Sequence, residues 1–137
     1  MGNCFGATTQ VQSPPPSKKH RKVEGQKFVT DNVLKLRTEA DGYHAKVVEC
    51  AKGSQAAYKK GDKSKAHQLS EDKKRWQKKQ EDANRRAAEQ VLAAQSWRTS
   101  GELDLHGLYL DEAIKATQDF LKHWSKKATR ETVLIIT

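Results

Sequence analysis

The chain has 137 residues, a mass of 15.5 kDa and a formal net charge of +9. Only 35% of the residues are hydrophobic and 31% are charged, so we expect part of the chain to stay outside any hydrophobic core. No apolar run approaches the roughly 18 residues that span a bilayer, which argues against a transmembrane protein. Two cysteines, Cys4 and Cys50, are too few for a disulfide framework, and no secretory signal is recognisable. These features predict a cytoplasmic protein.

The positive charge is concentrated in the first two thirds of the chain. Residues 1–30 carry a net charge of +4, residues 31–98 carry +6, and residues 99–137 carry −1. Excess positive charge favours polyanionic partners, which are nucleic acids or anionic membrane surfaces, without choosing between them.

Residues 1–30 are predicted to form a disordered tether that contains a run of three prolines and a short basic stretch. Its first residues nearly match a myristoylation signal, in which Gly2 becomes the acceptor after removal of Met1. Gly6 stands where Ser or Thr is preferred, and Cys4 is placed for palmitoylation. Two acyl chains and the basic stretch would allow peripheral contact with the cytoplasmic face of a membrane. The alternative is an unmodified tail.

Residues 31–98 are predicted to form two antiparallel helices. Thr30 or Asp31 is placed to cap the first helix, and the second begins after Asp62 or Ser64. Gly42 and Gly53 each weaken the first helix, so a break near either glycine is an alternative to one continuous helix. Apolar residues at spacings of three and four form the stripe Val33, Leu36, Ala40, Tyr43, Val47, Cys50, Ser54 and Ala57 on the first helix. The corresponding stripe on the second is Ala66, Leu69, Trp76, Ala83, Ala87, Val91 and Ala94, with Tyr58, Leu69 and Trp76 expected in the contact between the two helices.

Residues 101–137 are predicted to form one β-α-β unit after a turn at residues 98–101. Residues 103–106 alternate as in a strand, and residues 133–136 form an unbroken apolar run, typical of a buried parallel strand. The helix between them is expected to bury a stripe of Leu110, Ala113, Ile114, Thr117, Phe120, Leu121 and Trp124. The fold class is therefore mostly α, with a small α+β part.

Two stretches of the sequence resemble parts of a known family. Residues 103–108, with the sequence LDLHGL, are followed by Asp111-Glu112-Ala113 and by Leu134-Ile135-Ile136-Thr137. This segment resembles the first half of an Smr (small MutS-related) domain. The preceding residues resemble the Smr-associated helical domain of unknown function, DUF1771. That second resemblance rests on Leu36-Arg37, Ala40, Ala56-Ala57-Tyr58, Gly61-Asp62, Ala66, Leu69-Ser70-Glu71, Asn84 and Ala87-Ala88.

The resemblance covers about residues 32–137 and implies a nucleic-acid endonuclease or binding module. Smr domains are associated with DNA nicking and with cleavage of mRNA on stalled ribosomes. The resemblance therefore implies a nucleic-acid partner, with RNA favoured over DNA, and an association with the ribosome. The acid and the histidine of the family's Asp-x-His-Gly motif correspond to Asp104 and His106. Smr domains continue into a Gly-x-Gly loop, a helix and two strands, whereas this sequence ends at Thr137. The resemblance therefore implies a truncated domain that is inactive by itself.

Asp104 and His106 lie two residues apart on a predicted strand, which places both side chains on one face. A carboxylate beside an imidazole can orient the ring for acid–base transfer, with the 2′-hydroxyl of RNA as the nucleophile. Gly107 is expected to allow close approach of a phosphate. Spacing alone favours a structural interpretation, in which Asp104 caps a turn and His106 bonds to the backbone, whereas the resemblance favours the functional one. The other histidines share no ligand spacing, so neither a metal nor a cofactor is expected.

Residues 73–86 contain seven Lys and Arg residues around Trp76. One interpretation is a phosphate-binding surface with Lys74, Lys78 and Arg85 as nucleic-acid contacts. The interleaved acids favour the alternative, a solvated face held by the ion pairs Glu71–Arg75, Lys78–Asp82 and Arg85–Glu89. Trp76 is expected to lie on the apolar stripe, opposite most of these cations.

The sequence thus predicts a nucleic-acid-binding or nucleic-acid-processing protein related to Smr endonucleases, with Asp104 and His106 in the retained half of the site. The alternative is a non-catalytic, membrane-tethered helical adaptor. The oligomeric state and the substrate sequence are not predicted.

Overall fold

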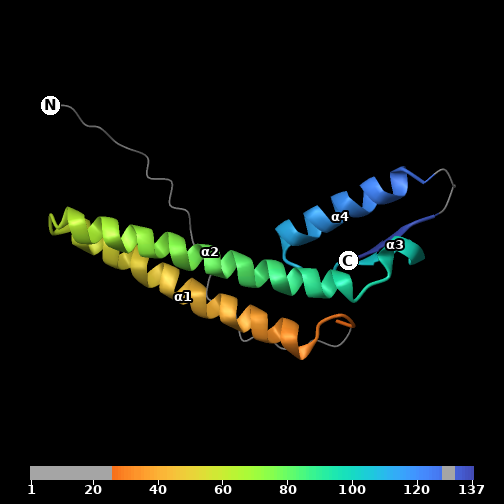
Figure 1. The fold of residues 1–137 in the computed structure, drawn as a ribbon, viewed down its shortest axis with the longest axis horizontal. Helices are drawn as coiled ribbons and strands as arrows, with labels where there is room; N and C mark the ends of the chain where they lie inside the picture. The colour runs from red at the N-terminus through yellow and green to blue at the C-terminus, as the bar shows by residue number, and fades with distance from the viewer. Residues whose placement is uncertain (1–25, 128–131) are drawn as a thin grey trace.

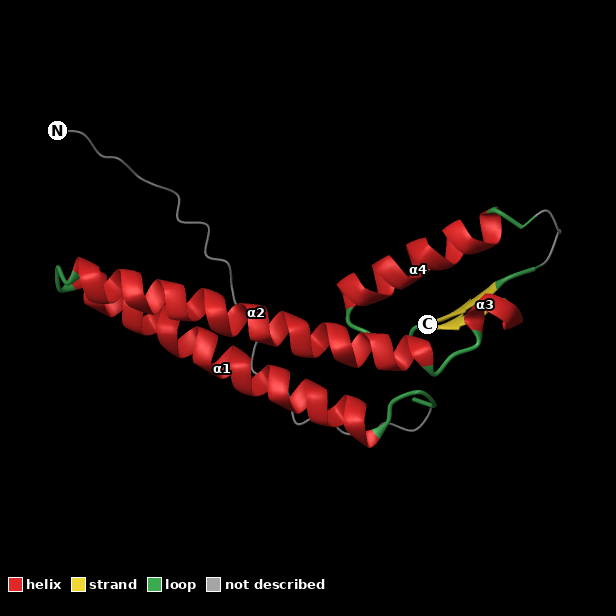
Figure 2. Cartoon of the chain, in the orientation of Figure 1, coloured by secondary structure: helices red, strands yellow, loops and turns green. Residues whose placement is uncertain are grey.

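A computed structural model describes residues 26–127 and 132–137, so Gly2 and Cys4 lie outside the described residues. The described chain is mostly helical and contains one two-stranded parallel sheet, which confirms the predicted class (Figures 1 and 2). No described helix combines the length and the apolar character needed to cross a bilayer. The elements, in chain order, are α1 (Asp31–Lys59), α2 (Lys63–Ala93), α3 (Trp97–Ser100), β1 (Glu102–Asp104), α4 (Leu110–Ser125) and β2 (Leu134–Ile136).

Helices α1 and α2 lie side by side along most of their length, and α2 returns toward the start of α1 (Figure 1). The side chain of Thr30 accepts a hydrogen bond from the backbone N–H of Val33 at 3.3 Å, as expected for the cap of α1. Asp62 caps α2 by accepting from the N–H of Lys65 at 3.0 Å. Between them, Gly61 has φ = +82°, a left-handed conformation that turns the chain back on itself.

The contact between α1 and α2 departs from the predicted stripes at Ala94, which is exposed just beyond the end of α2, and at Tyr58. This residue was expected in the contact, but it is 68% exposed, and its neighbour Ala57 is buried instead. Consecutive residues of a helix point about 100° apart, so only one of the two can face α2. Helix α1 also continues unbroken through Gly42 and Gly53. A Cβ on Gly53 would lie 3.1 Å from Cδ1 of Leu69, so the missing side chain provides room for this leucine of α2.

The C-terminal part folds around the parallel pair β1 and β2, whose register places Leu103 beside Ile135 and Asp104 beside Ile136. The residues predicted as a turn before β1 form the short helix α3, which ends at Gly101 with φ = +72°. Strand β1 also ends at Asp104, two residues earlier than predicted, so His106 lies in the turn that follows. The buried residues of this part are Trp97, Leu103, Ala116 and Phe120.

Helix α4 buries only part of the predicted stripe, and it also buries Ala116, which the stripe leaves out. Ala116 and Phe120 are buried, whereas Leu110 is 76%, Ile114 48% and Leu121 51% exposed. The helix has apolar residues on more than one side, and the sheet covers the side that contains Phe120. The predicted stripe is therefore wrong for these three exposed residues.

The two parts of the structure share a boundary at Leu108. One buried cluster consists of Val29, Val33, Leu36, Ala87 and Val91, and Leu108 packs against it. Leu108 also packs against the cluster around Phe120. The turn between β1 and α4 therefore lies against the helical pair. Val29, within the segment predicted as a tether, is only 3% exposed and belongs to the first cluster.

Candidate functional site

The turn after β1 brings Asp104 and His106 together. One carboxylate oxygen of Asp104, Oδ1, accepts a hydrogen bond from the backbone N–H of His106 at 2.9 Å. The same oxygen lies 2.6 Å from Nδ1 of the His106 ring. The Asp104 side chain is 14% exposed and that of His106 is 40% exposed. A mostly covered carboxylate therefore holds a ring that remains accessible to solvent.

This contact determines which ring nitrogen of His106 is available for chemistry. A carboxylate can only accept, so Nδ1 must carry the proton that the two atoms share. In the neutral ring, Nε2 then has a free lone pair and can accept a proton from a substrate. The arrangement has the form of an acid–base group oriented by a carboxylate.

Gln95, just beyond the end of α2, holds the backbone of Asp104 on the side away from β2. Its side-chain Nε2 donates to the carbonyl of Asp104 at 2.7 Å, and its Oε1 accepts from the N–H of the same residue at 2.9 Å. On the opposite side of β1, the N–H of Leu105 donates to the carbonyl of Ile136 at 2.9 Å. The amide of Gln95 thus takes the place that a neighbouring strand would have.

Arg37 of α1 anchors the other end of the same turn. It is 3% exposed and donates to both carboxylate oxygens of Glu112, at 2.8 and 2.6 Å. It also donates to the carbonyl of Gly107 at 3.1 Å and to Oδ1 of Asn84 at 2.9 Å. A planar guanidinium with five donors suits this fork, because it bonds a carboxylate in two places and still reaches a carbonyl.

Two neighbours of Arg37, Glu112 and Tyr109, also contact each other at the start of α4. Glu112 also accepts from the backbone N–H of Tyr109 at 2.8 Å, which caps α4. The ring of Tyr109 stacks on the guanidinium at 3.9 Å. Burial raises the pKa of the Tyr109 hydroxyl, and the positive charge of Arg37 opposes that rise.

Gly107 is packed against the N-terminal segment. Its φ is +84°, and a Cβ at this position would overlap a methyl group of Val29. The glycine is therefore explained by packing and backbone conformation. The predicted contact of Gly107 with a phosphate stays a prediction.

Two of the three predicted nucleic-acid contacts on α2, Lys74 and Arg85, are in ion pairs. Lys74 binds Glu71 at 2.8 Å, and this contact lowers the pKa of Glu71. Arg85 binds Asp82 and, at 2.7 Å, Glu89, and hydrogen bonds to both carboxylates raise its pKa.

Of the three predicted ion pairs on α2, only Arg85–Glu89 is confirmed. Arg75 binds Asp72 at 3.3 Å instead of Glu71, and Asp82 binds Arg85 instead of Lys78. Both observed pairs join residues three apart. On a helix, side chains three apart are neighbours, just as side chains four apart are.

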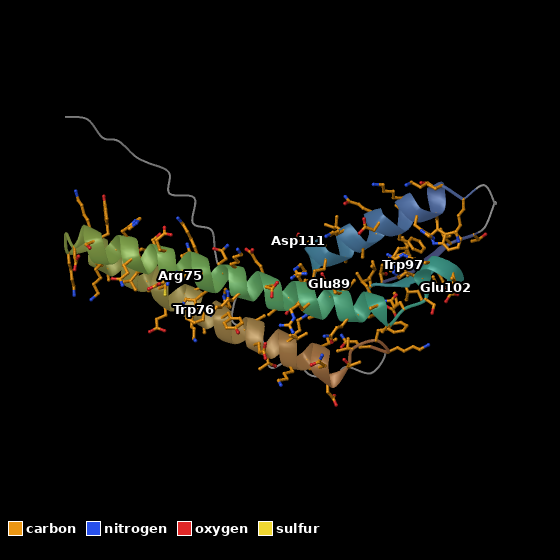
Figure 3. All side chains as sticks on the ribbon, viewed as in Figure 1. Arg75, Trp76, Glu89, Trp97, Glu102 and Asp111 are labelled. Atoms are coloured by element: carbon orange, nitrogen blue, oxygen red, sulfur yellow. The ribbon has the colours of Figure 1, made fainter. Side chains whose placement is uncertain are left out.

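An open groove of about 710 Å³ lies along this part of the helical pair. Beside it, Trp76 of α2 stacks on Tyr43 of α1 with ring centroids 5.9 Å apart. The ammonium groups of Lys46 and Lys79 lie over the Trp76 ring at 3.9 and 4.4 Å, so the ring is closer to cations than the sequence predicted. Figure 3 places Arg75 and Trp76 midway along the pair, away from Trp97 and Glu102 near β1. The groove is lined by Glu39, Tyr43, Arg75, Lys78, Lys79, Glu81, Asp82, Ala83, Arg85 and Arg86.

Sequence reasoning found Asp104 and His106 but missed Gln95 and Arg37. A helical wheel places Arg37 at the border of the apolar stripe, next to Val33, which was the available signal. The part of the chain that the structure describes holds no cluster of three His, Cys, Asp or Glu residues arranged to bind a metal ion.

Comparison with known families finds a match for the helical part of the chain. Residues 34–96 match the model of DUF1771, a domain of unknown function. This range covers nearly all of α1 and α2 and includes Gln95.

Two curated relatives extend the comparison. The chain is 43% identical over 89 residues to Endonuclease NBR9 of Saccharomyces cerevisiae, which covers 64% of this chain and 37% of that protein. It is 37% identical over 84 residues to an Smr domain-containing protein of Schizosaccharomyces pombe, which covers 61% of this chain and 41% of the relative. The matched part thus spans about two fifths of the length of each relative. The search of solved structures found no match.

Proposed function

We propose that this chain is an RNA-binding protein of the Smr type, in which Asp104 and His106 are the acid–base part of a phosphodiester-cleaving site. In this proposal, residues 31–98 form the helical unit and residues 101–137 correspond to the first half of an Smr domain. The observation that supports the site most strongly is the 2.6 Å contact between the Asp104 carboxylate and Nδ1 of His106. The names of the two relatives, an endonuclease and an Smr domain-containing protein, support the class of reaction.

The chemistry follows from the free Nε2 of His106. This nitrogen accepts the proton of an RNA 2′-hydroxyl, whose oxygen then attacks the adjacent phosphorus. The bond from phosphorus to the 5′-oxygen breaks, and that oxygen takes up a proton from water, which leaves a 2′,3′-cyclic phosphate and a 5′-hydroxyl. Asp104 stabilises the positive charge that the ring gains when it accepts the proton.

The sequence predicts a half-domain that is inactive by itself; because the carboxylate and the ring are in contact, we propose instead a low rate of cleavage by this chain. Cleavage of a phosphodiester places extra negative charge on the phosphate in the transition state, and cationic groups stabilise it. Among the described residues, no Lys or Arg is bonded to Asp104 or His106. Single-turnover conditions, with protein in excess over RNA, are therefore the appropriate assay.

Cleavage of a structured RNA by the chain and by His106→Ala tests the proposal. The exposed His67 on α2 provides a matched control, because His67→Ala removes the same ring far from β1. We expect slow cleavage by the chain and by His67→Ala, with at least a 100-fold loss in His106→Ala. Equal cleavage by His106→Ala and the unaltered chain would remove His106 from the site.

The groove between α1 and α2 is the proposed RNA-binding surface. Lys78 and Arg86 line it and, unlike Lys74 and Arg85, are not in ion pairs among the described residues. They are therefore available to phosphates without loss of an existing partner. We retain Lys74 and Arg85 as secondary contacts, since each would have to exchange a carboxylate for a phosphate.

The N-terminal signal supports a second proposal, a membrane-tethered adaptor on the cytoplasmic face of a membrane. Gly2 and Cys4 are placed for two acyl chains, and two chains are needed for stable anchoring. Metabolic labelling with a myristate analogue is expected to mark the full chain but not Gly2→Ala. Equal labelling of both proteins would contradict acylation at Gly2.

A further inference from the structure

We infer that the helical unit matching DUF1771 positions the Asp104–His106 pair, with Gln95 and Arg37 as positioning residues on either side of it. The consequence for cleavage rests on the proposed function, whereas the effect on the His106 ring does not. Both residues lie within the matched range of 34–96.

Gln95 controls the position of Asp104 because it bonds both backbone groups of that residue. The two hydrogen bonds, 2.7 and 2.9 Å long, fix the peptide units on each side of Asp104. From that backbone, the carboxylate reaches both the N–H and the ring of His106. A displacement of the Asp104 backbone therefore changes the contact that sets the proton on Nδ1.

Gln95 is itself fixed to the end of α2. Its backbone N–H donates to the carbonyl of Leu92 at 3.2 Å, and its side-chain Nε2 is 3.4 Å from the carbonyl of Val91. These carbonyls belong to the last turn of the helix, where helical donors are lacking. The side chain of Gln95 thus connects the end of α2 to the backbone of Asp104.

Arg37 fixes the turn on the other side of His106. It holds the carbonyl of Gly107 and both oxygens of Glu112, which caps α4. Because Arg37 is 3% exposed and bonded in a fork, lysine cannot replace it with the same geometry. His106 is therefore flanked by two contacts from the helical unit, one to residue 104 and one to residue 107.

The experiment compares Gln95→Leu with the unaltered chain by NMR, and Gln77→Leu serves as the control. Gln77 is exposed on α2, so Gln77→Leu makes the same substitution at a position away from β1. The ring 15N shifts of His106 report which nitrogen carries the proton. We expect Nδ1–H in the unaltered chain and in Gln77→Leu, and a shift toward the Nε2–H form in Gln95→Leu. His106 ring shifts in Gln95→Leu identical to those of the unaltered chain would overturn the inference.

Amide hydrogen exchange provides the second measurement. The Asp104 N–H donates to Gln95, whereas the Leu105 N–H donates to Ile136. In Gln95→Leu we expect exchange at Asp104 to accelerate at least tenfold while Leu105 changes little, which also shows that the sheet remains folded. Acceleration of both amides together would mean that the part has unfolded. Gln95→Glu then decides, because it keeps an acceptor for the Asp104 N–H and replaces the donor with a carboxylate oxygen that repels the Asp104 carbonyl. Unchanged ring shifts in this variant overturn the inference.

The two proposals fail in different ways. If the chain does not cleave RNA but the ring shifts respond to Gln95→Leu, the positioning role holds and the proposed reaction fails. If the chain cleaves RNA, we expect Gln95→Leu and Arg37→Lys to lower kcat about tenfold and to leave KM unchanged, because neither residue contacts the substrate in the proposed site. An effect on KM alone would contradict a positioning role.

Discussion

Gly107 has a backbone conformation in which any side chain is strained, and the space beside its Cα is filled by Val29. Substitution with alanine forces a left-handed conformation on a residue with a Cβ and displaces a buried valine. We expect Gly107→Ala to lower the free energy of unfolding by about 1–3 kcal/mol. Chemical denaturation measures this change.

Gly42 is the matched control for that substitution. It lies inside α1, and a Cβ there would meet no atom within 4 Å. Alanine is the better helix former, so Gly42→Ala is expected to raise the free energy of unfolding by roughly 0.5–1 kcal/mol. Opposite signs for the two variants support the structure of the turn after β1; a stabilising Gly107→Ala would refute it.

At the scale of single elements, α4 provides a direct test of which face is buried. Phe120 is fully buried against Trp97 and Leu103, whereas the adjacent Leu121 is 51% exposed. We expect Phe120→Ala to cost about 3–5 kcal/mol of stability. Leu121→Ala is expected to stay within about 0.5 kcal/mol of the unaltered chain. Thermal unfolding of both variants distinguishes this face from the stripe that the sequence favoured, since that stripe would make both losses large.

The turn between α1 and α2 and the start of each of these two helices were predictable because their signals are local, unlike the end of β1 and the short helix α3. Thr30, Gly61 and Asp62 each act on groups within a few residues, so the sequence shows them directly. The buried side of α4 was not predictable in this way. Its apolar residues extend around the helix, and which side is covered depends on a sheet formed by residues far along the chain.

At the scale of the whole molecule, the cations of α2 are predicted to bind RNA through those that lack carboxylate partners. The double variant Lys78→Ala/Arg86→Ala is expected to weaken binding of a structured RNA about tenfold. It is also expected to reduce the slope of log affinity against log salt concentration by roughly 1–2, which corresponds to the loss of one or two phosphate contacts. Lys59→Ala/Lys60→Ala removes the same charge at the exposed turn and is the control. Fluorescence anisotropy across a salt series measures both effects. Equal weakening by the two variants would show that RNA binding depends on net charge alone and not on the groove.

The candidate site shows the limit of sequence reasoning at this scale. Asp104 and His106 are two residues apart, so their contact was predictable, but the predicted reason was wrong: β1 ends at Asp104, and the turn after it brings the ring to the carboxylate. Arg37 and Glu112 are 75 residues apart, and a lone arginine beside an apolar stripe is ordinarily solvated. Only the fold shows that this charge is buried with its partner, and that a neutral amide at Gln95 replaces a strand.

In the proposed site Asp104 and His106 act as one unit, and a double-mutant cycle of RNA cleavage measures this most directly. The proteins are the unaltered chain, Asp104→Ala, His106→Ala and the variant that combines both changes, each assayed for kcat/KM on one structured RNA. If Asp104 acts only by orienting the ring, the double variant cleaves as slowly as His106→Ala and no slower. Losses that multiply in the double variant would show independent roles and contradict the account.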